Sequence, residues 1–267
     1  MDKPITMRKI LFKLLNSFGV SIVKTSYLKE LSTQNKIDNN IFDEKNSLIN
    51  NALNLLRQND FNPKHIIDIG ANHGTWVREV FKIFPHSNYT LIEPQAWLSE
   101  SFKDLLQTNN FCYIPVGVGK ENGTFMFTIV DRDDSCNFKM TADEARQQGF
   151  KQIPIEVKTV NNIVKSSNFG VPDMLKIDAE GLDLEVLEGA SDVLGITEVI
   201  LLEASVVNPH FKNDIKTVIQ YMDEKGYVLF DITDLNRPFN NKILWLVELL
   251  FIKRNSNFSV INWTKSN

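Results

Sequence analysis

The sequence predicts one doubly wound α/β domain with a helical extension at its N-terminus. The chain has 267 residues, which suits one large domain or one domain with an appendage. From residue 64 onward, short apolar runs alternate with stretches of helical spacing. Repeated strand–helix alternation is typical of parallel strands joined by helical crossovers, and hence of a doubly wound sheet.

The expected elements follow from apolar periodicity and from their flanking Gly and Pro residues. The expected strands are 65–70, 89–94, 112–118, 174–180, 199–205, 227–232 and 244–254. The expected helices between them are 75–84, 96–107, 182–190 and 214–225.

Two parts of the chain, the N-terminal residues and a stretch in the middle, do not follow this strand–helix alternation. Residues 7–30 and 43–58 predict two helices, so we expect an N-terminal helical extension over 1–58 and the sheet domain over 59–267. Residues 119–172 contain two β-like runs, GTFMFTIV and IPIEVKTV, around a polar segment. We expect this stretch to form a β-rich insertion on the substrate side, because insertions on a regular scaffold commonly carry specificity.

The composition narrows the class of protein. The chain is 43% hydrophobic and 23% charged with a net charge of −4, which argues against a disordered chain and against a nucleic-acid partner. Cys112 and Cys136 form no CxxC pair and are expected to be ordinary thiols in a reducing compartment. Lys13 interrupts the apolar start and no apolar run approaches the ~18–20 residues of a membrane span, so we expect a cytoplasmic protein.

The first candidate site is the turn from Asp68 to Gly74, with the sequence DIGANHG. It joins the first strand to the first helix, where a doubly wound sheet receives its ligand. Asn72 and Thr75 occupy the second and third glycine positions of the dinucleotide pattern G-x-G-x-x-G, which disfavours a nicotinamide cofactor. A tight turn without any ligand remains the alternative.

Glu93 ends the second strand, 23 positions after Gly70. An acidic residue at about this distance accepts hydrogen bonds from ribose hydroxyls in dinucleotide-binding folds. The turn and the carboxylate together favour a ligand that contains a nucleoside. A solvated carboxylate at the edge of the sheet is the alternative.

The third candidate is the run KIDAEG, in which Asp178 and Glu180 leave the fourth strand. Ligands of such sheets bind outside the carboxyl ends of the strands, so several acidic groups converge on one crevice. Convergent carboxylates suit a cation such as a sulfonium better than a pyrophosphate. Carboxylates that only favour the start of the next helix are the alternative.

These segments resemble the FkbM family of S-adenosylmethionine-dependent methyltransferases. The resemblance covers about residues 55–254 and is most specific at DMLKIDAEGLDLEVLEGA. It implies the seven-stranded, Rossmann-like class I methyltransferase sheet with an antiparallel last strand, and O-methylation of sugars and natural products.

The resemblance also implies roles for individual residues. Gly70, Ala71, Asn72 and Gly74 would wrap the methionine end of the cofactor, with Asp68 in the same constellation. Glu93 would hold the ribose, and Val116 and Gly117 would lie near the adenine. Asp178 and Glu180 would face the reacting centre. Where the family has Leu-Asp before the fourth strand, this chain has Val160-Asn161, so the involvement of a divalent metal stays open.

Transfer to a sugar hydroxyl needs a base or a metal ion beside the hydroxyl. The candidates for the base are Asp178, Glu180, Glu203 and His210, and His210 has the best intrinsic pKa for this task. His210 can equally be a surface loop histidine. Asp131, Asp133 and Asp134 resemble a metal cluster by their spacing, but a solvated acidic loop is the more common outcome.

The leading interpretation is therefore a methyltransferase that acts on oxygen of a glycan, a lipid-linked saccharide or a natural product. A non-catalytic module that kept the fold is one alternative, and an NAD-dependent oxidoreductase is a weaker one. Residues 1–30 hold six basic and two acidic residues. Their helix could lie on the inner face of an anionic membrane, or pack on the domain or on a second subunit as a dimer element.

Overall fold

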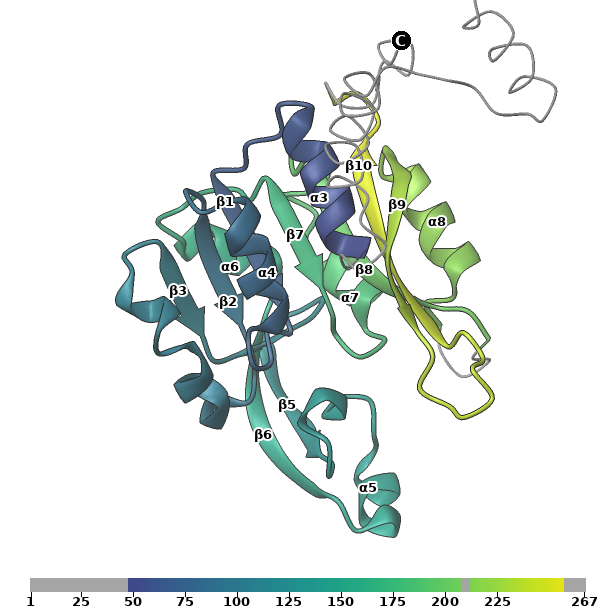
Figure 1. Cartoon of the computed structure of the whole chain (residues 1–267). Helices are drawn as coiled ribbons and strands as arrows, with labels where there is room; N and C mark the ends of the chain where they lie inside the picture. The colour runs from purple at the N-terminus through teal and green to yellow at the C-terminus, as the bar shows by residue number, and fades with distance from the viewer. Residues whose placement is uncertain (1–47, 208–211, 257–267) are drawn as a thin grey trace, which may run out of the picture. The chain divides into compact units, whose positions relative to one another are not determined.

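The computed structural model describes residues 48–207 and 212–256. Its main sheet has seven strands in the order β3-β2-β1-β7-β8-β10-β9 (Figure 1). The last strand, β10, lies between β8 and β9 and runs antiparallel to both, whereas β7 and β8 pair in parallel. The predicted doubly wound sheet with an antiparallel last strand is therefore confirmed. The strands are β1 (His65–Ile69), β2 (Asn88–Ile92), β3 (Phe111–Ile114), β7 (Met174–Ile177), β8 (Val199–Ser205), β9 (Tyr227–Asn236) and β10 (Leu246–Lys253).

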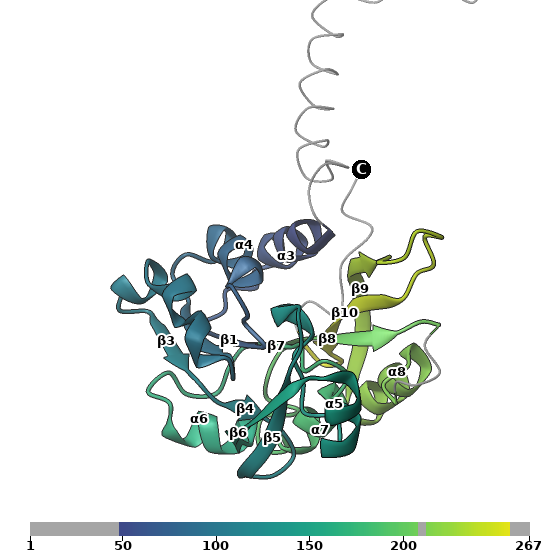
Figure 2. The ribbon, with the colours of Figure 1, turned by 90° about the horizontal axis from the view of Figure 1, so that it is seen from below.

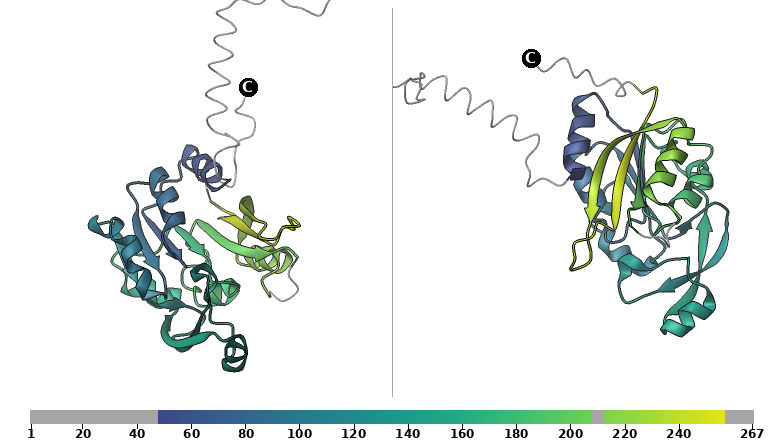
Figure 3. Two further views of the ribbon diagram at one scale, coloured as in Figure 1. Left: turned by 60° about the horizontal axis from the view of Figure 1, so that its bottom comes forward. Right: turned by 90° about the vertical axis from the view of Figure 1, so that its right-hand side faces the viewer.

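Helices cover both faces of this sheet and give it two hydrophobic cores. One face is covered by α3 (Leu48–Gln58), α4 (Thr75–Ile83) and the 3-10 helices η1 (Ala96–Phe102) and η2 (Leu105–Gln107). The opposite face is covered by α6 (Val160–Ser166), α7 (Asp183–Glu188) and α8 (Ile215–Glu224). Figure 3 shows α3 and α8 on opposite sides of β9 and β10. Burial on both faces explains why β1 and β7 consist of buried residues only.

The helix α3 belongs to the packing of the sheet domain. Ile49, Ala52, Leu53 and Leu56 lie in the same core as the buried residues of α4 and β1. The extension predicted for residues 1–58 therefore contributes its last helix to this core. Residues 7–30, predicted as a helix, lie outside the described residues.

The insertion forms a small sheet of its own, in the order β4-β6-β5. Its elements are β4 (Gly117–Val118), β5 (Gly123–Ile129), η3 (Asp133–Ser135), α5 (Ala142–Gln148) and β6 (Lys151–Lys158). In Figure 1 it lies beyond the end of the main sheet to which the strands β2 and β3 point, and in Figure 2 it stands in front of that end. The predicted β-rich insertion thus has the expected strands, but residues 160–166 form α6 on the main sheet instead.

Two predicted elements differ from the structure. The expected strand 112–118 is divided into β3 and β4, which belong to different sheets, because Pro115 has no N–H to continue a ladder. The expected helix 96–107 consists of η1 and η2. Ser99 and Ser101 lower the helix propensity of this stretch.

No helix in the described ranges, 48–207 and 212–256, is long and apolar enough to span a bilayer. Cys112 is exposed and Cys136 is buried, and both are free thiols.

Candidate active site

The turn after β1 lies directly against the end of β7. Gly70 has a φ of 74°, and a Cβ atom at this position would stand 2.1 Å from the carbonyl oxygen of Asp178. Only glycine allows both the backbone angle and this close approach. The N–H groups of Gly70 and Ala71 donate to the carbonyl of Ile92 at 2.9 and 3.1 Å, so the turn is fixed to the end of β2 as well.

Glu93 holds the turn and the segment after β2 together. Its Oε2 accepts a hydrogen bond from the N–H of Asn72 at 2.9 Å, and its Oε1 accepts from the N–H of Gln95 at 3.0 Å. Burial raises the pKa of this carboxyl, and the N–H groups of Gln95 and Asn72 oppose that shift. Each carboxylate oxygen keeps a second lone pair, so Glu93 can accept further hydrogen bonds from a ligand.

Behind the turn lies a group of three charged residues, of which Asp68 on β1 and Lys176 on β7 are buried and Asp178, just after β7, is partly exposed. The ammonium of Lys176 lies 3.0 Å from Oδ2 of Asp178 and 3.5 Å from Oδ1 of Asp68. Burial lowers the pKa of Lys176, but the carboxylates of Asp178 and Asp68 outweigh it and hold the pKa above its usual value. Asp68 is completely buried, so its contact with Lys176 orders the strand ends beneath the turn.

Replacing Lys176 with methionine is expected to destabilise the protein by about 3 kcal/mol, because it leaves the fully buried carboxylate of Asp68 without its cation. Urea unfolding of the variant measures this change. Lys82, which pairs with Glu79 on the surface, is the matched control, and Lys82→Met is expected to cost less than about 1 kcal/mol. Equal stability of Lys176→Met and wild type would contradict the structural role of this charge group.

Four carboxyl groups gather where β7 and β8 end and α7 begins. Burial, followed by the charge of Asp178, raises the pKa of Glu180 to about 8 and that of Asp183 to about 7. The same two causes raise the pKa of Glu203 well above its usual value. Glu180 and Asp183 are therefore able to exchange protons near neutral pH, which is the range a general base requires.

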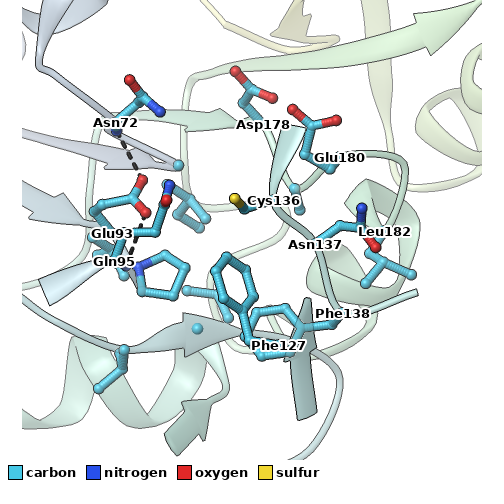
Figure 4. A pocket seen from close by; sticks show the side chains of 18 of the residues that line it. Asn72, Glu93, Gln95, Phe127, Cys136, Asn137, Phe138, Asp178, Glu180 and Leu182 are labelled. Atoms are coloured by element: carbon cyan, nitrogen blue, oxygen red, sulfur yellow. Dashed lines mark hydrogen bonds between the residues drawn. The ribbon is translucent and has the colours of Figure 1, made fainter. Parts of the chain in front are cut away.

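A pocket opens between these carboxyl groups and the insertion, as Figure 4 shows. Asp178 and Glu180 lie side by side on one border, Glu93 and Gln95 on another, and the rings of Phe127 and Phe138 close the side toward the insertion. The residues that line it are Ile69, Gly70, Asn72, Ile92, Glu93, Pro94, Gln95, Val116, Gly117, Val118, Phe127, Asp133, Asp134, Cys136, Asn137, Phe138, Asp178, Ala179, Glu180 and Leu182.

Most residues singled out from the sequence meet in this pocket. Gly70, Asn72, Glu93, Val116, Gly117, Asp178 and Glu180 all line it. Asp68 and Ala71 are buried beside the turn, and Gly74 is the N-cap residue of α4. His210 lies outside the described residues.

Several lining residues were not among the predicted site residues. The position of Gln95, two residues after Glu93, could have indicated a role in the site, because its backbone N–H donates to the Glu93 carboxylate. Phe127, Cys136, Asn137 and Phe138 come from the insertion and carry no local motif. They reach the pocket only because the small sheet folds back over the strand ends.

The acidic segment 131–134 is engaged in contacts within the protein. Asp133 Oδ2 lies 2.7 Å from Nε2 of His73, and Asp134 pairs with Arg132 at 2.7 Å. Among the described residues, no three His, Cys, Asp or Glu side chains are placed to hold a metal ion.

The strand order and the pocket at the carboxyl ends of β1, β2 and β7 define a Rossmann-like methyltransferase fold. The family described as Methyltransferase FkbM domain matches residues 68–229. The chain belongs to this family and is a methyltransferase.

Individual relatives are distant. Methyltransferase 1 of Beauveria bassiana (strain ARSEF 2860) is 20% identical over 183 residues, which cover 61% of this chain and 72% of the relative. The crystal structure of Methyltransferase FkbM from Methylobacillus flagellatus KT is 17% identical with a TM-score of 0.49, and the match covers 71% of this chain and 44% of that chain. N-methyltransferase NodS from Bradyrhizobium japonicum WM9 is 10% identical with a TM-score of 0.44 over 81% of this chain and 98% of its own. This chain thus spans less than half of the length of the FkbM structure.

Proposed function

We propose that the protein transfers the methyl group of S-adenosylmethionine to a sugar hydroxyl of a glycan, a lipid-linked saccharide or a natural product. The observation that carries this proposal is the arrangement of the pocket in Figure 4, with the rings of Phe127 and Phe138 at one end, Asp178 and Glu180 at the opposite end and Glu93 at the side between them. That order of surfaces matches an aromatic base, a ribose and a cationic sulfonium.

The residues present suit this cofactor. Ile92, Val116, Phe127 and Phe138 provide an apolar slot for the adenine ring. Glu93 has acceptor capacity left for ribose hydroxyls. Asp178 places negative charge at the opposite end, where it would attract a sulfonium, and Glu180 adds to that charge when it is ionised.

The methyl group passes directly from cofactor to acceptor, so the protein forms no covalent bond and contributes mainly by positioning the reactants. Bound there, S-adenosylmethionine would supply an electrophilic methyl group on a positively charged sulfur. Glu180 in its ionised form orients the acceptor hydroxyl and takes its proton. The neighbouring Asp178 is fixed by Lys176, and its carboxylate provides a negative charge beside Glu180. Leu182 and Phe138, which also line the pocket, exclude water from the reacting atoms.

The raised pKa of Glu180 favours oxygen as the methylated atom. A hydroxyl is a weak nucleophile and gains from a base whose pKa lies near the working pH. A module without catalytic function would have no need for such a base. The oxidoreductase alternative conflicts with Asn72 and Thr75 at the glycine positions of the dinucleotide pattern.

Thermal unfolding with added ligands tests the cofactor. S-adenosylmethionine and S-adenosylhomocysteine at 100 times their Kd should each stabilise the protein by about 2.7 kcal/mol, or roughly 5–10 °C for a domain of this size. NAD at the same concentration should leave the Tm unchanged. A Tm that rises with NAD alone would overturn the proposal.

The acceptor is tested by transfer of a labelled methyl group. Neutral mono- and oligosaccharides, each paired with its deoxy analogue at one hydroxyl, should show which oxygen is methylated. Transfer only to amines would contradict the proposed O-methylation and indicate an N-methyltransferase.

A further inference from the structure

Asp133 of the insertion contacts both segments that flank the proposed cofactor pocket. Its Oδ2 lies 2.7 Å from Nε2 of His73, which belongs to the turn after β1. Its backbone carbonyl accepts a hydrogen bond from Nε2 of Gln95 at 2.8 Å, and Gln95 belongs to the segment after β2. One residue of the insertion therefore binds the two backbone segments that carry the site.

The same two segments are joined from the other side by Glu93. Asn72 N–H and Gln95 N–H donate to the two oxygens of its carboxylate. His73 N–H in turn donates to Oδ1 of Asn72 at 2.8 Å. The contacts of Glu93, Asn72, His73, Asp133 and Gln95 thus close into a ring of hydrogen bonds around the proposed ribose site.

The orientation of His73 within this ring is determined by its partners. A carboxylate has only acceptors, so Nε2 of His73 donates to Asp133. In the neutral imidazole, Nδ1 is then an acceptor, and it lies 2.9 Å from Oγ of Ser101 on η1, which donates to it. The ring is therefore connected to the helical segment that follows β2.

The loop that carries Asp133 is also a wall of the pocket. Cys136 is buried three residues further on, and its sulfur accepts a hydrogen bond from the N–H of Val130 at 3.4 Å. Asn137 and Phe138 follow directly and line the pocket. Asn137 is held separately, by two backbone hydrogen bonds with Thr128 of β5 at 2.8 and 3.2 Å, so the loop is anchored to the small sheet at one end and to the two flanking segments at Asp133.

We propose that Asp133 is a positioning residue for the cofactor: its carboxylate holds the turn at His73 and its backbone carbonyl holds the segment at Gln95, in the arrangement that lets Glu93 bind the ribose. This inference rests on the proposed cofactor. Asp133 acts through its hydrogen bonds and not through its charge, so a neutral acceptor of the same shape can replace it. His73 and Asp133 side chains are 48% and 45% exposed, so the effect of losing their contact is moderate.

Calorimetry with three probes tests this role on the full chain: S-adenosylmethionine, S-adenosylhomocysteine and adenosine. Asp133→Ala is expected to weaken all three by about fivefold, because all three contain the ribose. Asp133→Asn is expected to restore binding to within about twofold of wild type, because its amide oxygen still accepts from His73. The double variant Asp133→Ala/His73→Ala should bind no more weakly than the weaker single variant, since both substitutions remove the same contact between His73 and Asp133.

Asp131→Ala is the matched control, since Asp131 is an exposed carboxylate of the same loop that does not line the pocket. It should bind all three probes like wild type. If Asp133→Ala weakened only the cationic S-adenosylmethionine and Asp133→Asn failed to restore it, Asp133 would act by its charge and the inference would be wrong. Equal binding by Asp133→Ala and wild type would overturn the inference alone. Failure of the wild type to bind any of the three probes would overturn the proposed cofactor, and the role of Asp133 with it.

Discussion

Replacing Glu93 with alanine is expected to weaken binding of S-adenosylmethionine and S-adenosylhomocysteine by about 100-fold or more. Two charge-assisted hydrogen bonds to ribose hydroxyls would be lost, each worth about 1.5–3 kcal/mol. The N–H groups of Asn72 and Gln95 would also lose the carboxylate that joins them. Isothermal titration calorimetry of the purified variant measures the change.

Two further variants separate the roles of Glu93. Glu93→Gln keeps the shape but places an amide NH₂ group against one of two N–H donors, so it should also bind poorly. Glu100→Ala removes an exposed carboxylate on η1 and should leave affinity unchanged. Wild-type affinity in Glu93→Ala would sink the assignment of the ribose site to this residue.

Replacing Glu180 with glutamine is expected to lower turnover by 100-fold or more, within the range of about 10²–10⁴ for the loss of a general base. In the wild type, the base is active when it is ionised. The pKa of Glu180 is raised to about 8 in the free protein and a bound sulfonium would lower it toward its usual value, so methyl transfer should increase with pH below about 8 and level off above it. Single-turnover rates on the saccharide found in the acceptor screen, between pH 6 and 9.5, measure this profile.

The variant profile should be flat where the wild-type profile rises, because glutamine does not titrate in this range. Affinity for neutral S-adenosylhomocysteine should change less than threefold, since the base contacts the acceptor and not the ribose. Glu185→Gln, on the neighbouring helix α7 and outside the pocket lining, is the control and should keep the wild-type profile. A wild-type rate and pH profile in Glu180→Gln would remove Glu180 from the mechanism, and Asp178→Asn would then test its neighbour.

The positions of the strands in the main sheet could be predicted because each strand carries its own signal. The run HIIDI is apolar around one acidic residue, and it is followed at once by a glycine turn. Such local features do not depend on what packs against them. Where the outcome depended on context, the prediction was less accurate. Pro115 interrupts the predicted strand, but the sequence does not show that the first half pairs with β2 and the second half with β6 in another sheet.

The site residues also divide into those with a local sequence signal and those whose position depends on packing. Gly70, Glu93 and Asp178 could be found because strand ends of a doubly wound sheet converge by construction of the fold. Phe127 and Phe138 could not, because their rings meet, 4.7 Å apart, only after the small sheet has formed. The raised pKa of Glu180 was equally inaccessible, since it results from burial that no spacing of residues reports.

Gly117 has a consequence for the exchange of parts between relatives. A Cβ atom at this position would stand 2.6 Å from the ring of Phe138. The ring therefore packs against strand β4 only because residue 117 has no side chain. A chimera that imports residues 131–150 from a relative without an aromatic ring at this place would leave a hole beside Gly117, and the converse exchange would produce a steric clash. The strand and the loop therefore have to be exchanged as one unit, because an exchange of the loop alone also changes part of the wall of the pocket.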